Sequence, residues 1–404
     1  MGWKKACKPV FPVLLTAMLA VSCIFDDPAS FADMDETYTY SLNLQVVSPC
    51  SDLPFAAGAS GTRSEGGDPK HELQEGTDAE SYINIDAGDY KILIFDENGN
   101  LVVNDFVTSV SQLYFSPTEP ENLIYRFSGR VAIPQETKQI QVMMLANWKS
   151  FNSQANYSFN EKPALETIYR NGTSWNFGTP QGGWSGWRPS LADKRAIPMF
   201  GISKTVDLTA VTTLTDDNRV DVEQFPLIRS IAKIEIIDNI SPEYETVIKM
   251  TGCTLSAYNT NGRYIPNVNE NGDWNQPPKQ VTAPSLPGVP GAATNLQFSK
   301  TTDSEGRTVY VAYLPEMGIN DNNRPNITVQ MTAWNGTSSF ERNSSFSFNN
   351  YKDNVEQTGG NALAAVLRNH IYRYTVTFDT VTQLNLEYAI CRWEEESVDI
   401  PEFD

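Results

Sequence analysis

Residues 38–47 of this 404-residue chain read YTYSLNLQVV, and apolar and polar side chains alternate through the stretch. Successive side chains of a β-strand point to opposite faces of a sheet, so the pattern predicts a strand that is buried on one face. Its apolar positions are Tyr38, Tyr40, Leu42, Leu44 and Val46. The pattern therefore indicates a β-rich fold in which this strand contributes part of the core.

Strand-like runs continue along the rest of the chain. Residues 90–95 and 101–103 flank Asn98-Gly99, a pair typical of hairpins because both central positions of a type I′ turn need positive φ. Further runs lie at residues 122–133, 139–147, 225–237, 252–259, 308–315, 326–334, 370–378 and 384–393, whereas a helical pattern is limited to residues 162–170. Many short strands separated by turn residues predict an all-β fold of two β-sandwich domains with few short helices.

Composition and charge argue against several classes of function. The chain carries 30 basic and 49 acidic residues, a net charge of −19, which disfavours binding to nucleic acid or to an anionic membrane surface. Only two histidines and five scattered cysteines are present, which leaves little material for a metal site or a catalytic triad. No GxSxG, HExxH or P-loop motif occurs. We therefore expect a protein without cofactor or metal, and not an enzyme.

The N-terminal segment predicts export. Lysines precede an apolar run at residues 10–21, which is too short to span a membrane comfortably, so residues 1–22 are interpreted as a signal peptide. The run ends in small residues before Cys23, as in a bacterial lipobox, where the cysteine thiol is acylated. The expected location is the surface of the outer membrane. The alternative is ordinary secretion with Cys23 as a bystander.

Two further features each leave two interpretations open. Cys253 and Cys391 fall in strand-like runs, and they either form a disulfide, which an oxidising compartment allows, or remain buried thiols. A Gly-rich loop at residues 174–188 carries Trp175, Trp184 and Trp187. These rings either stack on sugars or fold back into the core.

Several segments, taken in order, resemble the fimbrillin superfamily (FimA/Mfa-like), whose members are the subunits of type V pili. The lipobox is followed by the alternating strand at residues 38–47 and by a Gly- and Ser-rich linker that contains Arg63. The later matching segments are VMMLAN at 142–147, IPMFG at 197–201, LIRSIAK at 227–233, YVAYLPE at 310–316, LRNHIYRY at 367–374 and a final strand ending near Trp393. The resemblance covers nearly the whole chain.

The resemblance implies a domain organisation. After the signal peptide, residues 23–63 would be a propeptide with a placeholder strand, followed by transthyretin-like sandwiches at 64–215 and 216–404. An Arg-specific protease would cut between Arg63 and Ser64 and release the strand of Tyr38, Tyr40, Leu42, Leu44 and Val46.

The resemblance also implies an assembly mechanism and partners. The C-terminal segment of the next subunit, with Val398, Ile400 and Phe403 as inward side chains, would fill the emptied groove as a donor strand. Partners would be other fimbrillin subunits in a homo- or hetero-polymer, the outer membrane through the lipid anchor before processing, and a host or bacterial glycan or protein receptor. The implied function is a structural pilus subunit that supports cell adhesion.

Two alternatives remain at this stage: an outer-membrane glycan-binding lipoprotein, and a fimbrial anchor that keeps its lipid and does not polymerise. Arg63 is then a solvated linker residue and the C-terminal tail a frayed end.

Overall fold

The computed structural model describes residues 37–48, 77–103, 107–114, 123–148, 151, 176–209, 218–241, 243–244, 246–265, 295–303, 305–320, 322, 324–352, 354–380 and 383–392. Within these residues helical structure is limited to α1 (Thr77–Ser81), the 3₁₀ turn Gly359–Asn361 and Phe151, which is in 3₁₀ conformation, and the rest of the regular structure is β. The all-β fold class is therefore confirmed. The expected helix at 162–170 lies outside the described residues.

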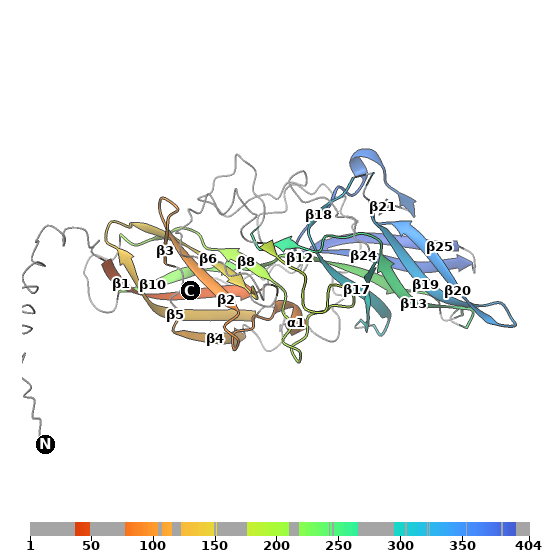
Figure 1. Ribbon diagram of the computed structural model, residues 1–404, viewed down its shortest axis with the longest axis horizontal. Helices are drawn as coiled ribbons and strands as arrows, with labels where there is room; N and C mark the ends of the chain where they lie inside the picture. Colours follow the sequence, from red (N-terminus) through yellow and green to blue (C-terminus); the bar gives the residue numbers. More distant parts are fainter. Residues whose placement is uncertain are drawn as a thin grey trace, which may run out of the picture.

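The first half of the chain builds two sheets (Figure 1). One has the order β10-β1-β5-β4, and the other has the order β11-β8-β6-β2-β3, with β9 paired to β6. The first sheet contains β1 (Thr37–Ser48), β4 (Ser109–Tyr114), β5 (Leu123–Pro134) and β10 (Arg219–Pro226). The second contains β2 (Tyr90–Asp96), β3 (Leu101–Val103), β6 (Gln139–Ala146), β8 (Met199–Ile202), β9 (Val206–Asp207) and β11 (Ile228–Arg229).

The second half also builds two sheets, with the orders β16-β17-β12-β24-β25 and β15-β13-β19-β20. Their strands are β12 (Ile231–Asp238), β13 (Ile248–Leu255), β15 (Leu296–Gln297), β16 (Ser299–Thr302), β17 (Thr308–Pro315), β19 (Asn326–Trp334), β20 (Ser339–Ser347), β24 (His370–Thr380) and β25 (Gln383–Arg392). Three two-stranded pairs complete the fold: β7 (Asn176–Phe177) with β14 (Gly262–Arg263), β18 (Met317–Gly318) with β23 (Ala365–Val366), and β21 (Tyr351–Lys352) with β22 (Val355–Glu356).

The two halves repeat one topology. In chain order β1, β2, β3, β4, β5, β6, β8 and β10 correspond to β12, β13, β15, β16, β17, β19, β20 and β24. The correspondence extends to strand direction, because β1 is parallel to β10 and antiparallel to β5, just as β12 is parallel to β24 and antiparallel to β17. One difference among the described strands is β25, which extends the sheet beyond β24 and has no counterpart beyond β10.

The sheets of the first half extend further along the chain than the sequence indicated. The fimbrillin resemblance implies a junction at 215–216, which falls within the polar and acidic residues 205–223. Strand β10 nevertheless pairs with β1, and β11 pairs with β8, so both belong to the sheets of the first half. The polar residues of β10 alternate with the buried Val220 and Val222, as expected for an edge strand. The second half begins at Ile231, with one residue between it and the end of β11.

The hairpin predicted at Asn98-Gly99 is present, since β2 and β3 pair in antiparallel fashion on either side of it. Only Gly99 has a positive φ, of 75°, so the turn is not type I′. The Asp96 carboxylate accepts hydrogen bonds from the backbone N–H groups of Asn98 and Asn100. This side-chain capping stabilises the turn with Asn98 at negative φ.

A buried asparagine joins three segments of the first half. Asn147 follows β6 with φ of 59°, and it is fully buried. Its Oδ1 accepts from the Asn84 backbone N–H at 2.9 Å, and its Nδ2 donates to the carbonyls of Ile197 at 2.6 Å and Tyr82 at 2.8 Å. The segment that precedes β2 is thereby tied to the ends of β6 and β8.

We predict that Asn147→Gly lowers the free energy of unfolding by about 2–4 kcal/mol, because three buried backbone groups lose their partner. Asn147→Ala should cost about 1 kcal/mol more, since alanine also resists positive φ. Urea unfolding followed by circular dichroism measures both. Asn343→Ala on the exposed face of β20 is the surface control, expected within about 0.5 kcal/mol of wild type. Equal stabilities for all three variants would contradict the assigned role of Asn147.

Candidate functional site: a central strand and a buried clamp

Strand β1 occupies an interior position in its sheet although it comes first in the described chain (Figure 1). It pairs with β5 without interruption, from Thr37 opposite Pro134 to Ser48 opposite Leu123. On its other side it pairs with β10, from Ser41 opposite Arg219, with a register shift between Leu44 and Val46. Both backbone edges of β1 are therefore hydrogen-bonded to neighbours.

The inward face of β1 completes the core of the first half. Tyr40, Leu42, Leu44 and Val46 are each at most 3% exposed, and Tyr38 is partly buried against the same cluster. The strand and its buried face are thus as the alternation predicted. Burying a large apolar side chain contributes about 1.5–3 kcal/mol, so the four buried residues together contribute on the order of 6–12 kcal/mol.

Helix α1, which follows the connection after β1, takes part in a cluster of buried charges. Lys233 Nζ lies 2.8 Å from Glu80 Oε1 and 3.0 Å from Glu235 Oε1, and the Arg373 Nε lies 2.7 Å from Glu235 Oε2. The Tyr313 hydroxyl donates to the same Glu80 carboxylate. Lys233, Glu235 and Arg373 are less than 10% exposed.

Arg229 of β11 holds the backbone of α1 in place. It is fully buried, and its Nε donates to the Glu80 carbonyl oxygen at 3.0 Å. Its two Nη atoms lie 3.3 Å from Ser81 Oγ and 3.4 Å from Asn369 Oδ1. We call Glu80, Arg229, Lys233, Glu235 and Arg373 the buried clamp, because they join α1 to β11 of the first half and to β12 and β24 of the second.

The electrostatics of the clamp favour the charged forms. Burial alone would lower the pKa of Lys233, but the charges of Glu80 and Glu235 outweigh it and raise that pKa. Burial alone would raise the pKa of Glu235, and Lys233 and Arg373 outweigh it in the other direction. Burial, followed by the charge of Glu80, raises the pKa of Tyr313, which stays a neutral donor.

For two of the three loop tryptophans the structure contradicts the expected contact with a glycan. Trp184 is 1% exposed and Trp187 is 4% exposed, so neither ring has a face free to stack on a sugar. The indole N–H of Trp184 donates to the Thr260 carbonyl at 2.7 Å. The loop folds back because its large rings pack against other aromatic side chains. Trp175 lies outside the described residues.

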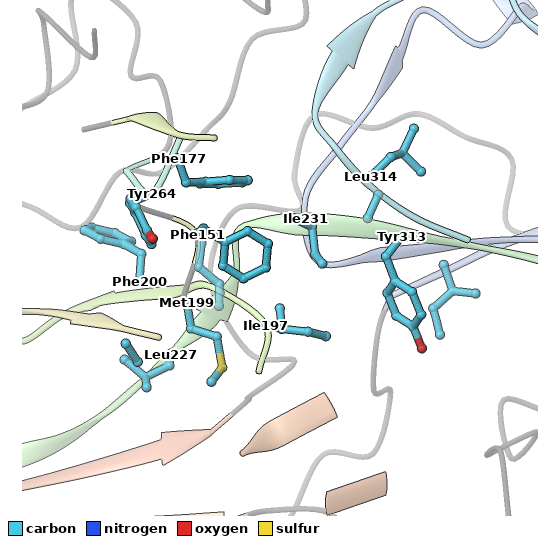
Figure 2. Packing of buried hydrophobic residues seen from close by; sticks show 14 of the residues in the cluster. Phe151, Phe177, Ile197, Met199, Phe200, Leu227, Ile231, Tyr264, Tyr313 and Leu314 are labelled. Carbon is cyan, nitrogen blue, oxygen red and sulfur yellow. The ribbon is translucent and has the colours of Figure 1, made fainter. Parts of the chain in front are cut away.

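The tryptophans belong to an aromatic cluster between the two halves. Ring centroids are 5.6 Å apart for Phe151 and Trp184, and 5.5 Å apart for Trp187 and Tyr313. Figure 2 shows Phe151, Phe177 and Tyr264 of this cluster close together. Phe177 and Tyr264 meet edge to face, 5.2 Å apart, across the β7–β14 pair. The cluster therefore packs residues of both halves into one continuous core.

The remaining sequence-predicted residues divide into two groups. Cys253 in β13 is a free and buried thiol, which agrees with the second of the two cysteine interpretations. The strand-like run at 384–393 is β25, which pairs with β24 and places Leu386 in the core. Outside the described residues lie Cys23, Arg63, Ser64, Val398, Ile400 and Phe403. Their roles stay predictions.

The residues that the structure describes hold no group of three or more His, Cys, Asp or Glu side chains that could bind a metal ion. Among those residues no helix is long and apolar enough to cross a membrane.

Comparison with known proteins finds similarity only to solved structures. No family model and no curated protein matches the chain. A candidate cell adhesion protein from Bacteroides eggerthii is 14% identical, with a TM-score of 0.43, and the match covers 89% of this chain and 96% of that one. One from Parabacteroides distasonis is 15% identical, with a TM-score of 0.44 and coverage of 87% and 97%.

A third likeness is to the fimbrial anchor protein Mfa2 from Porphyromonas gingivalis. It is 10% identical, with a TM-score of 0.32, and the match covers 88% of this chain and 98% of that one. The chain is thus distantly similar to candidate adhesion proteins and to a fimbrial anchor.

We predict that Lys233→Met lowers the free energy of unfolding by about 3–5 kcal/mol, because it leaves the buried Glu235 carboxylate and the largely buried Glu80 carboxylate short of a partner. Lys204→Met is the matched control. It removes an ion pair of the same 2.8 Å length, between Lys204 and Glu223, whose side chains are 74% and 65% exposed. Such exposed pairs contribute less than about 1 kcal/mol. Urea unfolding of both variants is the measurement, and equal losses would contradict the clamp.

The clamp should also make stability depend on pH. The lowered pKa of Glu235 means that its contribution is present above the ordinary value of 4.5 and is lost as pH falls through the folded value. The raised pKa of Lys233 keeps its contribution intact up to at least the ordinary value of 10.5. We expect wild type to lose more stability than a Lys233→Met/Glu235→Met double variant between about pH 5 and about pH 3. Parallel acid profiles would show that Glu235 is not stabilised by the fold.

Proposed function

We propose that this chain is a structural subunit of a type V pilus, assembled by release of its first strand and donation of a strand from another subunit. The observation that carries the proposal is the position of β1. It lies between β5 and β10 and fills the core, yet only residues 49–76 connect it to the elements that follow. A cut within that connection would leave β1 held by noncovalent contacts alone.

The second half supports the proposal by contrast. Strand β12 takes the place of β1 in the repeated topology, but a single residue separates it from β11. It also carries Lys233 and Glu235 of the buried clamp. Among the described strands, therefore, only the central strand of the first half could be released without pulling other elements apart.

Removal of β1 would create a binding site for an extended chain. The facing edges of β5 and β10 would expose unpaired backbone groups, and the sites of Tyr40, Leu42, Leu44 and Val46 would become open pockets. Such an edge accepts a new strand through backbone hydrogen bonds, while alternate side chains fill the pockets. In this scheme a cut between Arg63 and Ser64 triggers release, and acylation of Cys23 first brings the precursor to the outer membrane.

We infer a structural and adhesive role, rather than a catalytic one, at the cell surface, with other fimbrillin subunits as partners and a glycan or protein as receptor. The clamp suits such a subunit, because it secures α1 downstream of the cut and keeps the two halves joined when β1 leaves. The glycan-binding alternative loses its principal support, since Trp184 and Trp187 are buried. A non-polymerising anchor differs from a pilin in that β1 stays in place.

A disulfide that locks β1 in its sheet should block assembly. Asn43 of β1 and Ser128 of β5 are directly opposite each other, at a spacing that a disulfide can bridge. We predict that oxidised Asn43→Cys/Ser128→Cys protein forms no oligomers after treatment with an Arg-specific protease, and that a reducing agent restores them. Size-exclusion chromatography and electron microscopy of the trimmed protein measure assembly.

The control places the same crosslink in the second half. Thr328 and Ser345 are opposite each other in β19 and β20, with their hydroxyl oxygens 2.8 Å apart. Thr328→Cys/Ser345→Cys protein should assemble in both redox states. Assembly of the oxidised β1–β5 variant at the wild-type rate would show that assembly does not displace β1, and it would contradict the proposal.

A further inference from the structure

The buried lysine of the clamp holds two carboxylates on one nitrogen atom. Lys233 Nζ lies 2.8 Å from Glu80 Oε1 and 3.0 Å from Glu235 Oε1. The Lys233 side chain is 3% exposed, that of Glu80 is 12% exposed and that of Glu235 is 2% exposed, so water has little access to them. An amine is thus held against a carboxyl group in a dry site, and a second carboxylate is in place to take its proton. These are the components of amide formation.

The carboxyl group of Glu80 also receives a hydrogen bond from a neutral donor. The Tyr313 hydroxyl donates to Glu80 Oε1, the same oxygen that contacts Lys233. Burial, and then the charge of Glu80, raise the pKa of Tyr313, so this hydroxyl keeps its proton. A fixed donor stabilises negative charge that develops on the oxygen that it contacts. Tyr313 therefore favours Oε1 as the oxygen that leaves Glu80.

We propose that Lys233 and Glu80 condense to an amide, which crosslinks α1 to β12 covalently. The Lys233 ammonium and the Glu80 carboxylate become one amide and one water molecule, and no group is oxidised or reduced. All of the atoms that react belong to this chain, so the step needs no cofactor and no second reactant. The crosslink would form whether or not the chain assembles into a fibre.

Glu235 carries a proton in this step. Its Oε1 accepts one from the Lys233 ammonium, which frees the Nζ lone pair to attack the Glu80 carboxyl carbon. The new C–N bond gives a tetrahedral intermediate in which Tyr313 holds Oε1. The C–Oε1 bond then breaks, and its electron pair leaves with the oxygen. Oε1 departs as water with two protons from Nζ, one returned by Glu235 and one lost as the amide forms.

Condensation removes one buried charge of each sign from the clamp. Arg229, Lys233 and Arg373 are its cations, and Glu80 and Glu235 are its anions. The amide would leave Glu235 paired with Arg373 at 2.7 Å and would not change the net charge. Ion pairs are costly to keep away from water, and a neutral amide avoids that cost. The same exclusion of water protects the amide from hydrolysis.

The rate should have an unusual dependence on pH. The raised pKa of Lys233 and the lowered pKa of Glu235 make proton transfer between them rare, so the bond forms slowly. The transferred state holds as many protons as the charged pair, so its population is constant while both groups stay ionised. The ionisable groups around Lys233 come from α1, β11, β12, β17 and β24: Glu80, Arg229, Glu235, Tyr313 and Arg373. We expect a constant rate between about pH 6 and about pH 9, whereas an exposed lysine would react about tenfold faster per pH unit.

Peptide mapping of the purified full chain tests the bond directly. The folded chain is incubated for several days at a series of pH values, digested with trypsin and analysed by tandem mass spectrometry. We expect a branched peptide that joins Glu80 to Lys233 and is one water molecule lighter than its two parts. Lys204 and Glu223 are the internal control, because they are also 2.8 Å apart but are exposed, and they should give no branched peptide.

Variants assign the roles of the three side chains. Lys233→Arg keeps the positive charge but has no amine that attacks, and Glu235→Gln keeps the size but cannot take the proton. Both variants should yield no branched peptide. Tyr313→Phe should slow bond formation on the order of a hundredfold, because a donor to the leaving oxygen is lost. Circular dichroism before digestion shows that each variant is folded, and the wild-type digest decides the proposal if a variant is not.

The outcomes separate the bond from its mechanism. A folded wild-type chain that gives no branched peptide after incubation overturns the proposal. A bond that forms at the wild-type rate in Glu235→Gln shows that Glu235 does not carry the proton, and it overturns the mechanism. A rate that rises tenfold per pH unit, or a branched peptide from Lys204 and Glu223, indicates adventitious condensation and also overturns the proposal. The branched peptide at a constant rate in wild type alone supports it.

Discussion

The pairing of β1 with β5 and β10 is the constraint on which the first half of the molecule depends. Without β1 the sheet would be split into a β4–β5 pair and a lone β10, because those elements contact each other only through it. The same strand supplies four buried side chains to the core. Its covalent tie to the rest is nevertheless indirect, through residues 49–76. The sheet of the first half is therefore complete only while a strand occupies this position. Backbone pairing and core packing do not require that strand to be covalently linked to the same half.

The repeated topology gives each half a central strand, but only β12 follows its neighbour in the chain after a single residue. Strand β12 is fixed because it follows β11 after one residue and because Lys233 and Glu235 anchor it to α1 and β24. Buried ion pairs add little to stability compared with apolar packing, but they penalise any arrangement that separates their members. The clamp thus specifies where α1 sits, and the aromatic cluster around Trp184 and Trp187 packs the two halves against each other.

Alternation of apolar and polar residues was sufficient to predict β1, because one face of that strand is buried and the other is not. The boundary at 215–216, which the resemblance implies, falls before β10, an edge strand of the first half whose charged residues resemble a linker. Alternation could not reveal the clamp, because charged residues spaced by two in β12 usually indicate a solvated face, and here α1 and β24 cover them. The sequence could not decide between exposed and buried tryptophans for a related reason: glycines indicate an exposed loop, but a loop can carry large rings inward.

The long, uninterrupted register between β1 and β5 has a mechanical consequence. Figure 1 shows both strands running along the long axis of the molecule. Tension along that axis would pull a strand in this position lengthwise, so all of its twelve pairings with β5 would bear load together. Peeling from one end would instead break them one by one. Resistance to force is set by the rate of escape and not by equilibrium stability, and shear loading makes that escape slow. A strand held in this way can withstand tension along the molecule for as long as it stays in place.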